Sequence, residues 1–173
     1  MAPDQAGRWF EDILRWDNPR LEVTHDFIQW LFPLPTRSAF AGNAPLLAEA
    51  DLQQFRASPL LQRNVLRALN RLLKFYGIAL RGSGEDVDCL EAADFEARRR
   101  LWLTPENHHY ARLTRILRSL VLLGFPERRW WSCIVAIRPL SPPRPGTAGE
   151  KPCGFTREKM VTVSAITSWE IAL

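Results

Sequence analysis

The chain has 173 residues, of which 46% are hydrophobic, 24% charged and 10% aromatic. This length suits one domain, and the composition is that of a folded globular protein rather than a disordered one. No apolar run approaches the roughly 20 residues of a membrane-spanning helix. The first residues carry acidic side chains in place of the apolar segment of a secretory signal. We therefore expect a cytoplasmic protein.

Arginine supplies most of the positive charge. The net charge is +4, and of 23 basic residues only Lys74, Lys151 and Lys159 are lysine. A preference for arginine of this kind is typical of a GC-rich genome, so we predict a bacterial source. A modest positive charge permits weak attraction to nucleic acid or acidic lipid without specifying either. Peripheral membrane association therefore stays open as an alternative.

Two helices are predicted near the N-terminus. Residues 7–16 carry apolar side chains at helical spacing. Asn18 and Pro19 then form a favourable helix start, because asparagine is a good N-cap and proline at the first position loses no hydrogen bond. The second helix is predicted over residues 19–32 and ends before Pro33. Its expected apolar face consists of Leu21, Phe27, Ile28, Leu31 and Phe32.

A proline-rich loop over residues 33–45 precedes two further predicted helices. The first is short and lies around Glu49–Phe55. The second covers Pro59–Tyr76, with Ser58 as its N-cap and Gly77 in the left-handed position that ends a helix. One face of this helix is apolar, and its other faces carry arginine, asparagine and lysine. The apolar stripe consists of Leu61, Val65, Leu69, Leu72, Leu73 and Tyr76.

The next segments are a polar loop and two more predicted helices. The loop covers residues 81–88 and is followed by a helix near 87–100, with Cys89, Leu90 and Phe95 facing inward. A helix over residues 105–123 starts after Thr104 and ends at Gly124. Its expected buried side chains are Tyr110, Leu113, Ile116, Leu117 and Leu120.

No stretch before Pro126 alternates with the period of two that indicates a strand. We therefore predict an all-α fold, a compact single-domain bundle of about five or six helices over residues 6–126. Residues 127–173 are rich in proline and glycine and are predicted to be an irregular tail. Disorder and a non-native sequence are the open alternatives for that tail.

The string HDFIQWLFP holds the first candidate binding residues. His25 and Gln29 lie one helical turn apart, with Asp26 and Trp30 beside them. Imidazole, amide and indole groups together could hold the polar backbone of a bound peptide. In the structural alternative, His25 and Gln29 bind the neighbouring loop, because buried carbonyl groups need hydrogen-bond partners.

The string ENHHY raises the question of a metal site. Adjacent histidines on a helix point about 100° apart, and the HExxH spacing of zinc proteases is absent. We therefore predict neither a metal nor another cofactor. Instead, Asn107 and His108 are expected to bind a neighbouring loop near the start of the helix.

Three arginines form a ridge on the last predicted helix. Arg112, Arg115 and Arg118 have i, i+3, i+6 spacing, opposite the apolar face. Guanidinium groups in such a row can bind phosphates or a peptide carboxylate. Alternatively, the ridge is a solvated face in which Arg112 or Arg115 pairs with acidic residues of other helices.

Two long strings resemble the conserved domain of the opioid growth factor receptor family. These are HDFIQWLFPLP at residues 25–35, preceded by EDILRWDN, and WLTPENHHYARLTRILRSLVLLGF at residues 102–125. The resemblance covers roughly residues 10–125. It implies kinship with nuclear-associated animal receptors of the pentapeptide Met-enkephalin, and with short bacterial proteins that consist of little more than this domain.

The resemblance therefore implies a non-enzymatic binding module, with an enkephalin-like peptide as the expected ligand. Asp26 or Glu22 would hold the amine of such a peptide, the region of Trp16 and Trp30 its aromatic side chains, and an arginine its carboxylate. The candidate ligand-binding residues are His25, Asp26, Gln29, Trp30, Asn107, His108, Arg112 and Arg115.

The alternative function is an intracellular protein-interaction scaffold whose arginine ridge binds acidic partners or nucleic acid. No motif of a nucleic-acid-binding fold supports the latter, so nucleic acid is the less favoured partner. The sequence also lacks GxSxG, P-loop and dinucleotide-binding motifs, and we expect no enzymatic activity.

Overall fold

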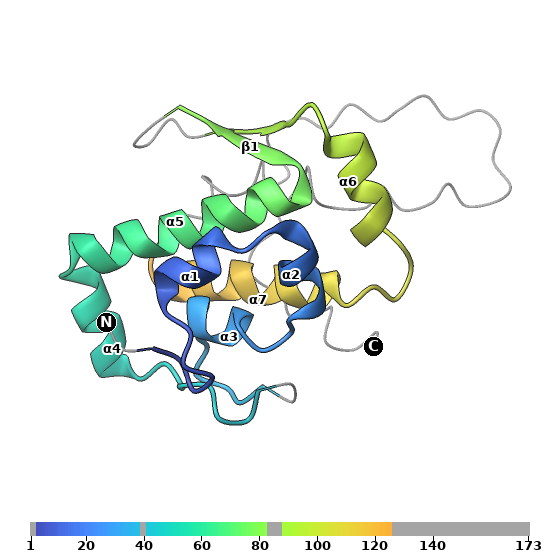
Figure 1. The fold of residues 1–173 in the computed structure, drawn as a ribbon. Coiled ribbons are helices and arrows are strands. Elements are labelled where there is room, and N and C mark those ends of the chain that lie inside the picture. Colours follow the sequence, from blue (N-terminus) through green and yellow to red (C-terminus); the bar gives the residue numbers. More distant parts are fainter. Residues whose placement is uncertain (1–2, 39–40, 83–87, 126–173) are drawn as a thin grey trace, which may run out of the picture. The chain divides into compact units, whose positions relative to one another are not determined.

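The computed structural model describes residues 3–38, 41–82 and 88–125 (Figure 1). Within these ranges the chain forms seven α-helices and one two-stranded antiparallel sheet. The predicted all-α class is therefore wrong, because the fold combines a mainly helical body with a small sheet. The predicted tail, residues 127–173, lies outside the described residues, so its irregular character stays a prediction.

Three short helices form the N-terminal part. They are α1 (Phe10–Arg15), α2 (Asn18–Val23) and α3 (Ile28–Leu31). The helix predicted over residues 19–32 is thus two helices, separated by an extended turn that begins at Thr24. All five residues of the predicted apolar face are nevertheless buried. The periodicity identified the buried side chains correctly but did not reveal the break in the backbone.

The two middle helices agree closely with expectation. They are α4 (Glu49–Arg56) and α5 (Pro59–Tyr76), and the bounds of α5 match the prediction. The Ser58 hydroxyl accepts a hydrogen bond from the backbone N–H of Leu61, and Gly77 has a φ of 80°. Both ends of α5 are therefore set by the residues that the sequence indicated.

A β-hairpin follows α5, where the sequence predicted a loop and the start of a helix. Strand β1 (Ile78–Arg81) pairs with β2 (Asp88–Glu91), with Leu80 opposite Cys89. Each strand has four residues, which is too short for an alternating pattern to stand out. Successive side chains of a strand face opposite sides, so Cys89 is buried as predicted, whereas Leu90 is 41% exposed rather than inward.

The last described helices are α6 (Phe95–Trp102) and α7 (His109–Leu122). Helix α7 begins four residues later than predicted, because Thr104 and Pro105 belong to the preceding turn. It ends near Gly124, which has a φ of 83°. No helix in the described part of the chain has the length and hydropathy that crossing a membrane requires.

One hydrophobic core joins these elements. Helix α5 packs on α1, α4, α6 and β1, and α3 packs on α7. Figure 1 shows α2 and α3 beside α7, although residues of α2 and α7 lie far apart in the sequence. The largest fully buried apolar and aromatic side chains are Leu21, Phe27, Phe32, Tyr76, Ile78, Trp102 and Leu120.

Candidate functional site

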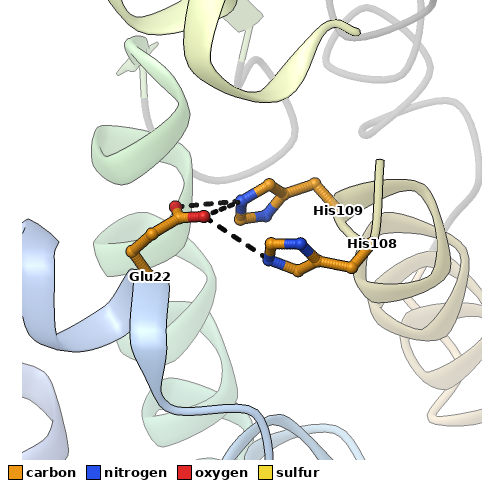
Figure 2. Close-up of side chains that lie close together, drawn as sticks. All are labelled: Glu22, His108 and His109. Carbon is orange, nitrogen blue, oxygen red and sulfur yellow. Dashed lines mark hydrogen bonds and ion pairs between the residues drawn. The ribbon is translucent and has the colours of Figure 1, made fainter. Parts of the chain in front are cut away.

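Glu22, His108 and His109 meet at the junction of α2 and α7, and we call them the acid–histidine cluster (Figure 2). His109 Nε2 lies 3.1 Å from Glu22 Oε1 and 3.0 Å from Glu22 Oε2. His108 Nε2 lies 3.5 Å from Glu22 Oε1. The two imidazole rings are 4.1 Å apart between centroids and tilted by 38°. Both histidines therefore turn toward the same carboxylate.

This convergence overturns the expectation that adjacent histidines diverge. The separation of about 100° describes the directions in which successive side chains leave a helix. Rotation about the side-chain bonds brings the ring tips of His108 and His109 back together, because both are drawn to Glu22. The geometric reason given against a shared ion thus does not hold.

His109 is fully buried, and this burial disfavours the protonated form of its imidazole ring. Burial lowers the pKa of His109 to about 4, an effect that the nearby Glu22 carboxylate only partly opposes. At neutral pH the ring is neutral, so its Nε2–H donates to Glu22. Its Nδ1 then accepts from the Tyr76 hydroxyl at 3.2 Å. Burial likewise lowers the pKa of the His108 imidazole and raises that of Tyr76.

Arg112 holds the backbone from which Glu22 projects. Its Nη1 donates to the carbonyl of Leu21 at 2.9 Å, and its Nη2 donates to those of Glu22 at 3.2 Å and Thr24 at 2.8 Å. The same Nη2 lies 3.2 Å from His25 Nδ1. Burial lowers the pKa of Arg112, although a guanidinium remains charged at any physiological pH. Arg112 is therefore a structural tie between α7 and α2.

Two further side chains of α7 continue this arrangement. Arg115 Nη1 donates to the carbonyl of Phe32 at 3.2 Å, and Ser119 Oγ donates to that of Pro33 at 3.0 Å. Arg112, Arg115 and Ser119 have i, i+3, i+7 spacing, which is one face of a helix. We call these three residues the α7 clamp. Arg112 is thus buried and binds carbonyl groups rather than the acidic partner expected for it, whereas its role as a ligand-binding residue stays a prediction.

The N-terminal candidate residues separate in the structure. His25 lies beside the cluster, with its ring 4.9 Å from that of His108. Asp26 instead forms an ion pair with Arg8 at 2.8 Å, and the hydrogen bond from Arg8 lowers the pKa of the Asp26 carboxyl. Gln29 is buried and donates to Ser38 Oγ at 3.1 Å.

The remaining candidates, Trp30 and Asn107, are not members of the cluster. Trp30 is half-buried on α3. Asn107 Nδ2 donates to the carbonyl of Leu101 and to Thr104 Oγ1, and its Oδ1 accepts from the backbone N–H of His109. Asn107 therefore binds the preceding turn, as predicted, and fixes the start of α7. Of the eight candidates, the structure brings together His25, His108 and Arg112.

Sequence reasoning did not place Glu22 beside the histidines, although it named Glu22 as a possible partner for an amine. It also missed the buried partner Tyr76 and treated His109 only as a weak metal candidate. Glu22 and His109 are 87 residues apart in the chain. No local pattern pairs residues at that distance, so only the packing of α2 against α7 reveals the cluster.

An open groove of about 730 Å³ lies along α5 and β1. Its apolar residues include Leu66, Ile78 and Leu80, and Arg63 and Lys74 supply positive charge. Also lining the groove are Arg67, Asn70, Ala79, Ala92 and Asp94. The sequence showed the basic face of α5 but not the hairpin beside it, so the groove was not predicted.

Comparison with known proteins identifies the relatives of this chain. The model of the opioid growth factor receptor conserved region matches residues 5–135. The opioid growth factor receptor of Rattus norvegicus is 37% identical over 121 residues, which are 68% of this chain and 20% of the receptor. The human receptor is also 37% identical over 121 residues, covering 68% of this chain and 17% of the receptor.

A second group of relatives has similar identity. Opioid growth factor receptor-like protein 1 of Mus musculus is 34% identical over 122 residues, which are 69% of this chain and 25% of that protein. This chain thus spans a quarter or less of the length of these relatives. No solved structure matches it. A bacterial source stays a prediction, whereas the resemblance seen in the two long strings is confirmed: the chain belongs to the family of the opioid growth factor receptor conserved region.

Proposed function

We propose that this domain is a non-enzymatic module that binds short peptides through a free C-terminal carboxylate. Family membership supports a receptor-like binding role, since the relatives carry the name of a receptor. The observation that carries the proposal is the open groove along α5 and β1. An enkephalin-like pentapeptide has the chemistry that this groove would accept.

The groove combines an apolar surface with positive charge. Leu66 and Leu80 are partly exposed and offer a contact surface for aromatic or aliphatic side chains. Arg63 and Lys74 are exposed and line the groove at different points along α5, so either can bind a carboxylate with charge-assisted hydrogen bonds. A volume of about 730 Å³ is within the range of small-ligand sites, which span roughly 300–1,000 Å³.

The peptide site predicted from the sequence is less suitable. Arg112 and Arg115 were expected to bind the peptide carboxylate, but both donate to backbone carbonyls of residues 21–32. Asp26 was expected to bind the amine, but it is paired with Arg8. Moving the proposed site to the groove leaves these interactions intact.

The alternative, a scaffold that binds acidic partners or nucleic acid through the arginine ridge, loses its main support. Arg112 is 6% exposed and Arg115 is only partly exposed. A partner could not bind the Arg112 guanidinium without breaking its hydrogen bonds to three carbonyl groups. The groove is therefore the better-supported binding surface.

Isothermal titration of the full chain with Met-enkephalin, and with the same peptide amidated at its C-terminus, tests the proposal. Losing charge-assisted hydrogen bonds costs about 1.5–3 kcal/mol, so Arg63→Ala with Lys74→Ala should weaken binding of the free-acid peptide about tenfold or more. Arg100→Ala removes an exposed arginine outside the groove and serves as the matched control.

The expected result is saturable binding of the free-acid peptide, weaker binding of the amide, and wild-type affinity for Arg100→Ala. Absence of heat at high micromolar peptide, or equal affinity of the double variant and the control, would contradict the proposal. Mass spectrometry of the incubated peptide should show it unchanged, and a cleaved or modified product would contradict the non-enzymatic role.

A further inference from the structure

We propose that Glu22, His108 and His109 form a binding site for a divalent transition metal, with Zn²⁺ as the best-suited ion. Each residue offers one ligand atom, and the three atoms all lie within 4.8 Å of one another. Two imidazole nitrogens and one carboxylate oxygen make a donor set that zinc proteins use when one coordination position stays open. This site is separate from the groove and does not depend on the proposed peptide binding.

The distances within the cluster are close to those of a metal site. With metal–ligand bonds of about 2.1 Å, neighbouring ligands of a tetrahedral ion lie about 3.4 Å apart. The Nε2 atoms of His109 and His108 lie 3.0 Å and 3.5 Å from the Glu22 carboxylate oxygens (Figure 2). All separations in the set lie within 4.8 Å, so the widest must shorten by at most about 1.4 Å. His108 is exposed and can make this movement without disturbing the core.

Neighbouring groups already hold two of the three ligands in place. The Tyr76 hydroxyl contacts His109 Nδ1 and directs the opposite nitrogen, Nε2, toward Glu22. The Arg112 guanidinium fixes the backbone of Glu22 by donating to the Glu22 carbonyl group. Such partners behind the ligands orient them and strengthen metal binding. The cluster is therefore pre-arranged rather than a chance meeting of surface side chains.

Binding of the ion changes the tautomer of His109. Without a metal, His109 Nε2–H donates to Glu22, and Nδ1 accepts from Tyr76. When Nε2 binds the ion, the single proton of the neutral ring resides on Nδ1 instead, by exchange with solvent, and no net proton is released. That Nδ1–H can then donate to the Tyr76 oxygen, because a hydroxyl both donates and accepts. The hydrogen bond between His109 Nδ1 and the Tyr76 hydroxyl is thus kept with its direction reversed.

The donor set also selects among ions. Mg²⁺ and Ca²⁺ prefer oxygen ligands, so one carboxylate and two imidazoles disfavour them.

The charge of Arg112 opposes any cation, and the Glu22 carboxylate offsets that charge within the cluster. Exposure of His108 leaves room for water to complete the coordination shell.

Calorimetric titration of the full chain with ZnCl₂ tests the site. The variants are Glu22→Gln and His108→Ala, each of which removes one ligand from a residue that is not fully buried. His25→Ala is the matched control, since it removes a neighbouring histidine outside the ligand set. Circular dichroism of each variant checks that the fold is retained. Titration with CoCl₂ adds a spectroscopic readout, because its visible bands report the ligands.

We expect one Zn²⁺ per chain, at least tenfold weaker binding by Glu22→Gln and by His108→Ala, and wild-type affinity of His25→Ala. MgCl₂ should produce no saturable heat. Wild-type protein that binds no Zn²⁺ would overturn the proposal. So would equal affinity of all the variants, or a cobalt spectrum dominated by thiolate charge transfer, since either result places the ion elsewhere.

Discussion

Helix α5 and the segment that contains α2 and α3 satisfy their backbone groups in different ways. Helix α5 has 18 residues with a capping serine at one end and a left-handed glycine at the other. Most of its backbone hydrogen bonds therefore lie within the helix itself. Helices α2 and α3 have six and four residues, so a large share of their carbonyl groups has no partner inside the helix.

The α7 clamp supplies those missing partners. Arg112, Arg115 and Ser119 donate to carbonyl groups at the C-terminal ends of α2 and α3. The segment is thus ordered by a distant helix, whereas α5 is ordered largely by its own residues. Helix α7, whose arginines suggested a basic surface in the sequence, therefore supports the α2–α3 segment.

Of the three substitutions considered, Arg112→Ala should lower the stability of the protein most. It removes one buried cation and leaves three carbonyl groups without their donor. We expect the free energy of unfolding to fall by roughly 3–5 kcal/mol. Urea denaturation measures this change, with Arg100→Ala as the control at an exposed arginine. Equal stability of the two variants would show that the α7 clamp contributes nothing.

Gly77→Ala tests the C-terminal end of α5, where Gly77 itself ends the helix. A Cβ at this position would lie 2.8 Å from the Cα of Phe95, and φ is positive. Left-handed backbone costs about 1–2 kcal/mol for alanine, and with the close contact we expect roughly 2–4 kcal/mol of lost stability. Gly42→Ala is the control, because its added Cβ meets nothing within 4 Å. Thermal or urea unfolding that ranks Gly42→Ala as the more damaging change would contradict this account.

Ser119→Ala should have the smallest effect of the three. It removes one hydrogen bond, from a fully buried hydroxyl to the carbonyl of Pro33. The expected loss is about 1–2 kcal/mol, since one acceptor is left unpaired. Thr114→Val is the comparison, because the Thr114 hydroxyl donates to its own helix at an exposed site. A larger loss for Thr114→Val would argue that the bond to Pro33 is dispensable.

The same contrast explains which features the sequence could predict. Helix α5 was predicted with correct bounds, because Ser58, the apolar stripe and Gly77 are all local signals. The break between α2 and α3 was missed, because apolar periodicity continues across it while the donors that permit it lie on α7. The hairpin was missed because its four-residue strands carry too little pattern.

The candidate site was predicted only in part, for a similar reason. His25, His108 and Arg112 do come together, but around Glu22 and His109. Helix geometry alone suggested that the two adjacent histidines diverge, and the rotation of their side chains toward a shared carboxylate has no signal in the sequence. Contacts made across nearly 90 residues depend on the tertiary fold.

The sequence separation of the α7 clamp also constrains how the protein is made. Its hydrogen bonds join residues that are 83 to 91 positions apart. At a translation rate of about 5–20 residues per second, the carbonyl groups of residues 21–33 leave the ribosome roughly 5 to 20 seconds before their donors. During that interval residues 21–33 lack the donors of these native hydrogen bonds, and a chaperone that binds nascent chains would find this segment available.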